Sequence, residues 1–208
     1  MSRGLGDVYK RQVYNIKFKI GTKGKSSVED DMATIADMET FSMSVDGTVQ
    51  TWTPMTTDGW QRSLMTGKSF SVSLKGKRNV GDKGNDYIAN TTFADGLNCS
   101  SRAIVEFPDG SRLEFDCVIN VTNNAGGDST DVAPLEFDLQ GDGKPVYTRA
   151  LSSLAITKQA TKTQYIIGDT LDIGGLEVSG TYSDGTKEVF SITKDNISGF
   201  DSSKPIEK

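Results

Sequence analysis

Histidine is absent from this sequence, and cysteine, proline and long apolar runs are scarce. Without histidine the chain lacks the usual general base and the commonest metal ligand, which excludes Ser-His and Cys-His nucleophile pairs. Its two cysteines, Cys99 and Cys117, form neither a CxxC motif nor a disulfide framework, so we interpret them as buried, reduced small hydrophobes. An enzyme would have to work with carboxylates, lysine or tyrosine alone. We expect no enzyme and no cofactor.

Basic residues are in the minority, with 23 Lys and Arg against 28 Asp and Glu, a net charge of -5 over 208 residues. This balance argues against a protein that binds nucleic acid by neutralising phosphates. It does not argue against a protein that DNA passes without sticking. No apolar run approaches the roughly 20 residues of a membrane-spanning helix, and no stretch near the start has the pattern of a signal peptide. The sequence therefore predicts a cytoplasmic protein without a membrane partner.

The first twelve residues differ in character from the rest of the chain. Residues 2–12 have the sequence SRGLGDVYKRQ, show little apolar periodicity and resemble the translation of a sequencing adaptor. We interpret 1–12 as an artefactual leader and leave it out of the fold argument. Without its three basic residues and one acidic residue the balance changes from 23 and 28 to 20 and 27, a net charge of -7.

The chain after the leader alternates apolar and polar residues with period two, which indicates half-buried β-strands. The clearest case is a hairpin over 102–121 that turns at Pro108-Asp109-Gly110. The same alternation predicts single strands over 13–20, 69–77 and 133–139.

Two segments before the strand at 69–77 have weaker patterns. Apolar residues at odd positions between 33 and 52, around the turn signal Asp46-Gly47, predict a hairpin of two short strands. Residues 22–31 are charged, contain glycine and serine and lack periodicity, which predicts a mobile loop.

Two short helices complete the predicted elements of this region. In 58–65, Trp60 and Leu64 lie four residues apart and Asp58 can cap the first turn. In 84–94, Tyr87 and Ile88 pair with threonines at helical spacing, and Asn85 is the candidate cap.

A change of composition near Arg149 predicts a second unit, made of short strands with regular turn signals over 154–158, 176–182 and 187–192. From 152 to 208 this unit has 57 residues. An immunoglobulin-like sandwich typically has about 100. We therefore expect an incomplete sandwich, truncated at the C-terminus, with exposed apolar positions and reduced stability.

Four segments of the chain resemble two known families. The segments WTPMTTDGWQRSLMTGKSFSVSLKGKRNVGDKGNDYIANTTF at 52–93 and CVINVTNNAGGDSTDVAPLEFDLQGDGKPVYT at 117–148 resemble the tail tube proteins, or major tail proteins, of long-tailed bacteriophages. The segments GDTLDIGGLEVSGTYSDGTKEVF at 168–190 and ISGFDSSKP at 197–205 resemble a bacterial immunoglobulin-like domain. The expected organisation is a leader at 1–12, a tail tube domain at 13–148 and a truncated immunoglobulin-like domain at 152–208.

The resemblance implies a fold and a structural role. The implied fold is mainly β: an antiparallel β-sandwich or barrel with one or two short helices, then the incomplete immunoglobulin-like sandwich. Tail tube proteins form stacked homohexameric rings around a tape measure protein, end at tail terminator and distal tail proteins, and let phage DNA pass through the lumen. The implied location is the virion tail, and the host cytoplasm during assembly. The immunoglobulin-like domain would decorate the exterior and contact cell-surface glycans.

Two sets of residues are candidates for this role. Glu114 and Asp116 alternate with apolar residues on one predicted strand, so they face either solvent or the lumen. Lys23, Lys25 and Glu29 belong to the polar loop 22–31, which would contact the next ring, since long polar loops of tube proteins reach that far.

Other patterns have weaker specificity. Thr66-Gly67-Lys68-Ser69 is similar to the end of a phosphate-binding loop, but Arg62 stands where the first glycine belongs. The acidic residues near Glu136 follow no calcium-loop spacing, and we interpret them as solvated rather than as metal ligands; they are Asp128, Asp131, Glu136, Asp138 and Asp142.

The two tryptophans and the function class leave alternatives open. Trp52 and Trp60 are anchors for either the core, which we favour, or a subunit interface. A bacterial surface or adhesion module is the alternative to a tail protein, because immunoglobulin-like domains occur on many surface proteins.

Overall fold

The computed structural model describes residues 13–203, which divide into two compact units. The first comprises 13–108 and Arg112–Thr148, and the second comprises Asp109–Ser111 and 149–203. The expected leader at 1–12 lies outside the described residues, so its interpretation as an adaptor stays a prediction. Among residues 13–203, no helix has the length and apolar character to cross a membrane.

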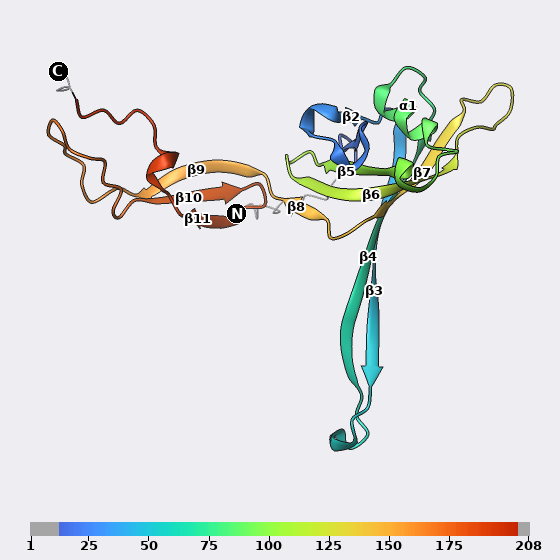
Figure 1. The fold of residues 1–208 in the computed structure, drawn as a ribbon, viewed down its shortest axis with the longest axis horizontal. Coiled ribbons are helices and arrows are strands. Elements are labelled where there is room, and N and C mark those ends of the chain that lie inside the picture. The colour runs from blue at the N-terminus through green and yellow to red at the C-terminus, as the bar shows by residue number, and fades with distance from the viewer. Residues whose placement is uncertain (1–12, 204–208) are drawn as a thin grey trace, which may run out of the picture. The chain divides into compact units, whose positions relative to one another are not determined.

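The first unit is built on one antiparallel sheet with the strand order β2-β1-β5-β6-β7-β4-β3, and β8 pairs with β6 beside this path. Figure 1 shows how the strands follow one another. Their bounds are β1 Lys17–Gly21, β2 Met32–Thr34, β3 Met38–Trp52, β4 Arg62–Lys77, β5 Ser100–Glu106, β6 Arg112–Asn123, β7 Pro134–Gly141 and β8 Val146–Thr148. The hairpin predicted over 102–121 is confirmed as β5 and β6, and the predicted strand over 133–139 as β7.

The sheet curls so that its two halves enclose the core. Phe18 in β1 packs against Phe41 in β3, with ring centroids 5.0 Å apart, although these strands stand near opposite ends of the strand order. Phe70 in β4 meets Phe115 in β6 edge to face at 4.9 Å. The fold is therefore mainly antiparallel β of the sandwich or barrel type with one α-helix, as the sequence predicts.

The helix α1 runs over Lys83–Asn90 and closes one side of this core with buried Ile88 and Ala89. It is shorter than the predicted 84–94. Its cap is Asp82, whose carboxylate accepts the backbone N–H of Asn85, so the assignment of Asn85 as the cap is wrong.

Asn85 is instead a fully buried hub of hydrogen bonds. Its amide nitrogen donates to the carbonyls of Ala36 and Lys77, at 3.2 and 2.9 Å, and its oxygen accepts from the Arg78 guanidinium at 2.8 Å and from the Asn79 backbone at 3.0 Å. The side chain thereby ties the segment after β2 and the end of β4 to the helix.

Three predictions for this unit need correction. The hairpin predicted over 33–52 is wrong, because β3 continues through Asp46 and Gly47 to Trp52. The helix predicted over 58–65 is wrong, because β4 begins at Arg62 and only a 3-10 turn, Met55–Thr57, precedes it. The strand predicted over 13–20 begins only at Lys17. Residues 22–31 connect β1 to β2 as a loop with the 3-10 turns Gly24–Ser26 and Glu29–Asp31, and the mobility expected for this loop stays a prediction.

The cysteines are both free in the structure. Cys117 is fully buried, and burial raises the pKa of its thiol to about 12, so it stays a protonated hydrophobic side chain as predicted. Cys99 is only half-buried and ends the 3-10 turn Gly96–Cys99, so the prediction of burial is wrong for this residue.

The second unit contains a three-stranded antiparallel sheet in the order β11-β10-β9. Its strands are β9 Leu151–Lys158, β10 Glu177–Tyr182 and β11 Lys187–Phe190, followed by a 3-10 turn at Lys194–Asn196. The three predicted strands are confirmed, with shifted ends. One face of the sheet forms an open apolar groove of about 600 Å³, lined by side chains that include Leu154, Ile156, Val178 and Phe190.

Candidate assembly surface

The most unusual feature of the first unit is a two-stranded arm formed by the distal halves of β3 and β4, residues 42–69. The partner strand β7 pairs with β4 only between Ser71 and Lys77, so beyond Ser71 the two arm strands pair only with each other among the described strands. Figure 1 shows the arm leaving the body as a narrow ribbon. Since strands rise about 3.3 Å per residue, the arm carries its tip well beyond the reach of the core.

One face of the arm is apolar and continues the buried face of the sheet. In the register, Phe41 faces Leu74, Met43 faces Val72 and Val45 faces Phe70, and the β4 members of these pairs are buried. The β3 members of the last two pairs and the next apolar pair along the same face are open to solvent: Met43, Val45, Val49 and Met65 are 45%, 64%, 50% and 51% exposed. We call these four residues, with Lys68, the arm face.

Lys68 lies at the centre of the arm face. Its partner across the ladder is Gly47, and Met65 lies over that glycine, because a Cβ added there would come within 2.9 Å of the Met65 methyl. Within the described residues, no carboxylate forms an ion pair with Lys68. The arm face is therefore an apolar surface with one unpaired cation.

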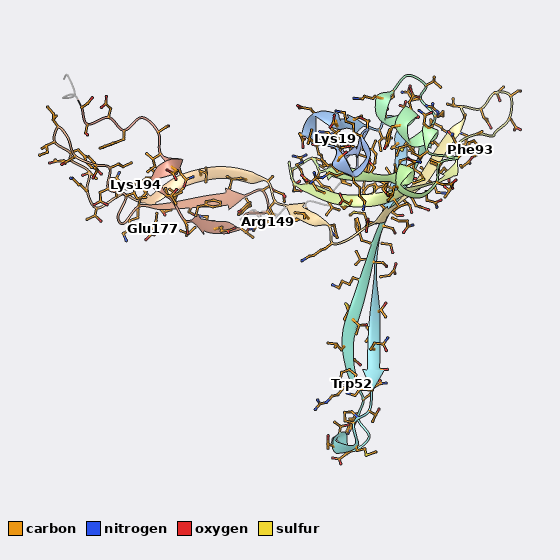
Figure 2. All side chains as sticks on the ribbon, in the orientation of Figure 1. Lys19, Trp52, Phe93, Arg149, Glu177 and Lys194 are labelled. Atoms are coloured by element: carbon orange, nitrogen blue, oxygen red, sulfur yellow. The ribbon has the colours of Figure 1, made fainter. Side chains whose placement is uncertain are left out.

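The tip of the arm exposes the largest side chains. Met55 and Trp60 are 104% and 78% exposed, and Trp52 is 46% exposed. Figure 2 labels Trp52 at this end of the arm. The chain reverses through Asp58 and Gly59, both with positive φ, at 49° and 82°. Both tryptophans thus lie on the arm, and the preference for a core position is wrong.

The outer side of β3 is an unpaired edge. This strand of 15 residues is the last in the strand order, and no described strand pairs with its other side. A long exposed edge presents a row of backbone N–H and C=O groups that can pair with another chain. The edge and the arm face together form a candidate assembly surface.

Glu114 and Asp116, the lumen candidates, lie next to each other on the polar face of β6, and the structure does not test their role. Glu114 is engaged by two cations, Arg102 at 3.5 Å and Arg112 at 3.7 Å, and its own side chain is 27% exposed. Asp116 faces Arg102 across the β5–β6 ladder and is exposed. The two carboxylates therefore stand in a face of mixed charge.

The loop candidates Lys23, Lys25 and Glu29 each form an ion pair. Lys23 pairs with Asp31 at 2.7 Å, Lys25 pairs with Asp142, and the carboxylate of Glu29 accepts two 2.9 Å hydrogen bonds from Arg112. These contacts lie on the surface and are individually weak. Together with the buried side chain of Ser27 they give residues 22–31 a defined conformation.

The weaker motifs gain no support from the geometry. Thr66–Ser69 lies within strand β4, whereas a phosphate-binding loop leads into a helix. Glu136 pairs with Lys75 at 2.9 Å, and Asp138 accepts from Ser73 and Asn120. Among the described residues, no group of three or more acidic or cysteine side chains is arranged to hold a metal ion.

Sequence comparisons concern the second unit. Residues 158–205 match the family described as bacterial Ig-like domain (group 3). A curated relative, pectate lyase L of Thermoclostridium stercorarium, is 44% identical over 59 residues, which are 28% of this chain and 5% of that protein. The chain thus spans about a twentieth of the length of this relative. The match supports the immunoglobulin-like fold expected for the second unit.

Structural comparisons concern two thirds of the chain. A chain in the tail of an empty gene transfer agent particle, described with C6 symmetry, has a TM-score of 0.50 and 21% identity, and the match covers 67% of this chain and 99% of that one. A chain in the virion of a native gene transfer agent particle has a TM-score of 0.49 and 20% identity, with the same coverage. At this identity the likeness to the tail chain concerns the fold, and this protein shares that fold.

Proposed function

We propose that this chain is a structural subunit that assembles with its own copies into the tube of a phage-like tail. Residues 13–148 build hexameric rings that stack around a tape measure protein, and the lumen later conducts DNA. Tail terminator and distal tail proteins close the ends. Residues 152–208 decorate the exterior, where they contact cell-surface glycans.

The observation that carries this proposal is the arm. An apolar face and a long unpaired strand edge, both on one projecting element, are unfavourable in a soluble monomer, because the first exposes hydrophobic area and the second invites aggregation. Both become buried when strands of neighbouring copies pair and a ring closes. The shared fold of a chain from a C6-symmetric tail supports the same arrangement.

The negative net charge of the chain is compatible with a tube through which DNA passes. With a net charge of -5, a tube of many copies carries a negative field, and like charge discourages DNA phosphates from adsorbing to its wall. We keep Glu114 and Asp116 as lumen candidates in this proposal. Their pairing with Arg102 and Arg112 reduces what they add to that field.

A bacterial surface or adhesion module is the second candidate, and the match of 158–205 to the bacterial Ig-like family favours it. An adhesin of this kind has no need for the arm. The tail proposal uses both units, so we prefer it.

Deleting the arm tests the proposed function. In an arm-less variant, Asn-Gly replaces residues 48–67, which joins the cross-strand pair Gly47 and Lys68 by a tight hairpin turn. We expect the full chain to form rings or tubes in negative-stain electron microscopy. The arm-less variant should retain cooperative thermal unfolding but remain monomeric in sedimentation. Monomers of the full chain at every concentration tested would overturn the proposal, as would tubes formed by the arm-less variant.

A further inference from the structure

A second exposed apolar site lies on the body, in the loop that follows α1. Phe93 is 94% exposed and Leu97 is 86% exposed, and Asp95 stands midway between them in sequence. Figure 2 labels Phe93 on the body of the first unit. We call residues 93–97 the knob.

The knob is held in place by local hydrogen bonds. The Thr91 and Thr92 hydroxyls donate to the carbonyls of Ile88 and Ala89, at 2.7 and 2.6 Å, and Asn124 donates to the Thr92 hydroxyl at 2.9 Å. At its far end the Cys99 thiol donates to the Ala94 carbonyl at 3.1 Å. These bonds order the backbone of the loop before it binds, which lowers the entropy cost of docking, and they present Phe93 and Leu97 as exposed apolar anchors.

The knob and the arm face are complementary in composition. The knob carries Phe93 and Leu97 two residues to either side of Asp95, and the arm face carries methionine and valine side chains on the same face as Lys68. Among the described residues, neither Asp95 nor Lys68 forms an ion pair. The carboxylate of Asp95 also makes no capping bond to the 3-10 turn that follows it.

We propose that the knob of one copy docks on the arm face of another copy, with Asp95 and Lys68 as the central ion pair. This inference rests on the proposed function, because it assigns a contact within that assembly. Pairing the arm face with its own equivalent would bring two lysines together, and pairing two knobs would bring two aspartates together. Both self-pairings are unfavourable, because like charges repel strongly in a desolvated contact. Knob to arm face is therefore the favoured pairing.

This pairing has a consequence for the assembly. A contact between two different patches of the same chain is heterologous, so an open assembly keeps one unused knob at one end and one unused arm face at the other after every step. Such contacts produce closed rings or open stacks instead of two-fold dimers. A tail needs this kind of interface.

A charge exchange tests the pairing. Lys68→Glu and Asp95→Lys are compared singly and together, with Lys187→Glu, an exposed cation of the second unit, as the matched control. We expect each single variant to raise the concentration needed for assembly by about tenfold or more, and the double variant to restore it to within about threefold of the native chain. The control should assemble normally.

Folding is measured separately on the dilute subunits. Both side chains are exposed and make no ion pair within the described residues, so thermal unfolding of each single variant should match that of the native chain. Normal assembly of both single variants would overturn the proposal, and so would failure of the double variant to recover while its subunits remain folded. If the native chain never assembles, the proposed function itself fails, which is a different result from a native chain that assembles without this pair.

Disulfide trapping provides a second measurement that does not depend on charge. In a Cys99→Ser background, copies with Lys68→Cys are mixed with copies with Asp95→Cys and oxidised under assembly conditions. We expect cross-linked dimers in the mixture and few with either variant alone. Equal cross-linking in the unmixed samples would contradict the knob-to-arm contact.

Discussion

Phe18 in β1 and Phe41 in β3 pack with their ring centroids 5.0 Å apart, and this contact joins strands from the two ends of the sheet. No hydrogen bond of the ladder links β1 to β3, so the aromatic pair and the side chains around it hold the curled sheet closed. Phe41 is also the last residue of β3 before the exposed arm.

Truncating this contact should destabilise the body. We expect Phe41→Ala to lower the free energy of unfolding by about 2 kcal/mol, less than for a fully buried phenylalanine because Phe41 is only partly buried. Chemical denaturation of the dilute subunit measures this loss. Val45→Ala, further along the same face but 64% exposed, is the control and should cost much less.

Asn85 should be more sensitive than any exposed polar residue of the sheet. Asn85→Ala leaves the Ala36 and Lys77 carbonyls and the Arg78 guanidinium without this partner in a buried place, so we expect a loss of about 3 kcal/mol. Thermal unfolding measures the effect. Asn120→Ala, on the exposed face of β6, should change the melting temperature little. A similar loss in both variants would contradict the role of Asn85 as a hub.

Asp31 should make the stability of the first unit depend on pH. The Lys23 ammonium and then the Val28 backbone N–H hold the pKa of Asp31 below its ordinary value of 3.8. A carboxyl with a lowered pKa in the folded state stabilises that state above the unfolded pKa and loses this contribution as the pH falls through the folded pKa.

Comparison with Asp31→Asn isolates this contribution. We expect the difference in melting temperature between the native chain and Asp31→Asn to be largest near pH 6 and to shrink below pH 3.8, as the native carboxyl becomes protonated. A difference that stays constant across this range would show that Asp31 acts without its charge.

The two tryptophans should report assembly directly. Both Trp52 and Trp60 lie on the arm, and the chain contains no others. We expect the fluorescence of the subunit to be quenched readily by acrylamide, and the tubes to show a shift to shorter wavelength and weaker quenching. Trp60→Phe separates the contribution of Trp52. Equal quenching of subunit and tube would mean that the tip stays exposed after assembly.

Much of the body of the first unit was predictable from sequence because apolar and polar residues alternate in strands such as β6 and β7 and the turn signals agree with them. In β6, every second residue from Leu113 to Ile119 is buried, which is the pattern that the hairpin prediction uses. Predicting the fold class required only this alternation of apolar and polar residues.

The arm was not predictable because long-range pairing overrides local signals there. Asp46-Gly47 is a strong turn signal, yet both residues find partners in Ser69 and Lys68, so the ladder continues through them. The spacing of Trp60 and Leu64 suits a helix, but Leu64 pairs with Gln50 across the arm. No local pattern distinguishes these cases, since the deciding partner lies well outside the window that such a pattern covers.

Because the arm strands are pleated, the number of residues added to a strand decides which face its side chains reach. Successive side chains point to opposite faces, so inserting one residue between Phe41 and Met43 would turn Val45 and Val49 toward the serine side and present polar groups where the arm face is apolar. Adding two residues to each strand would lengthen the arm and keep its faces. A bulge is the exception: Thr66 is an extra residue of β4 between the pairs Thr48–Gly67 and Val49–Met65, and the arm face continues past it. Without a further bulge, working arms of different reach should therefore differ by even numbers of residues per strand.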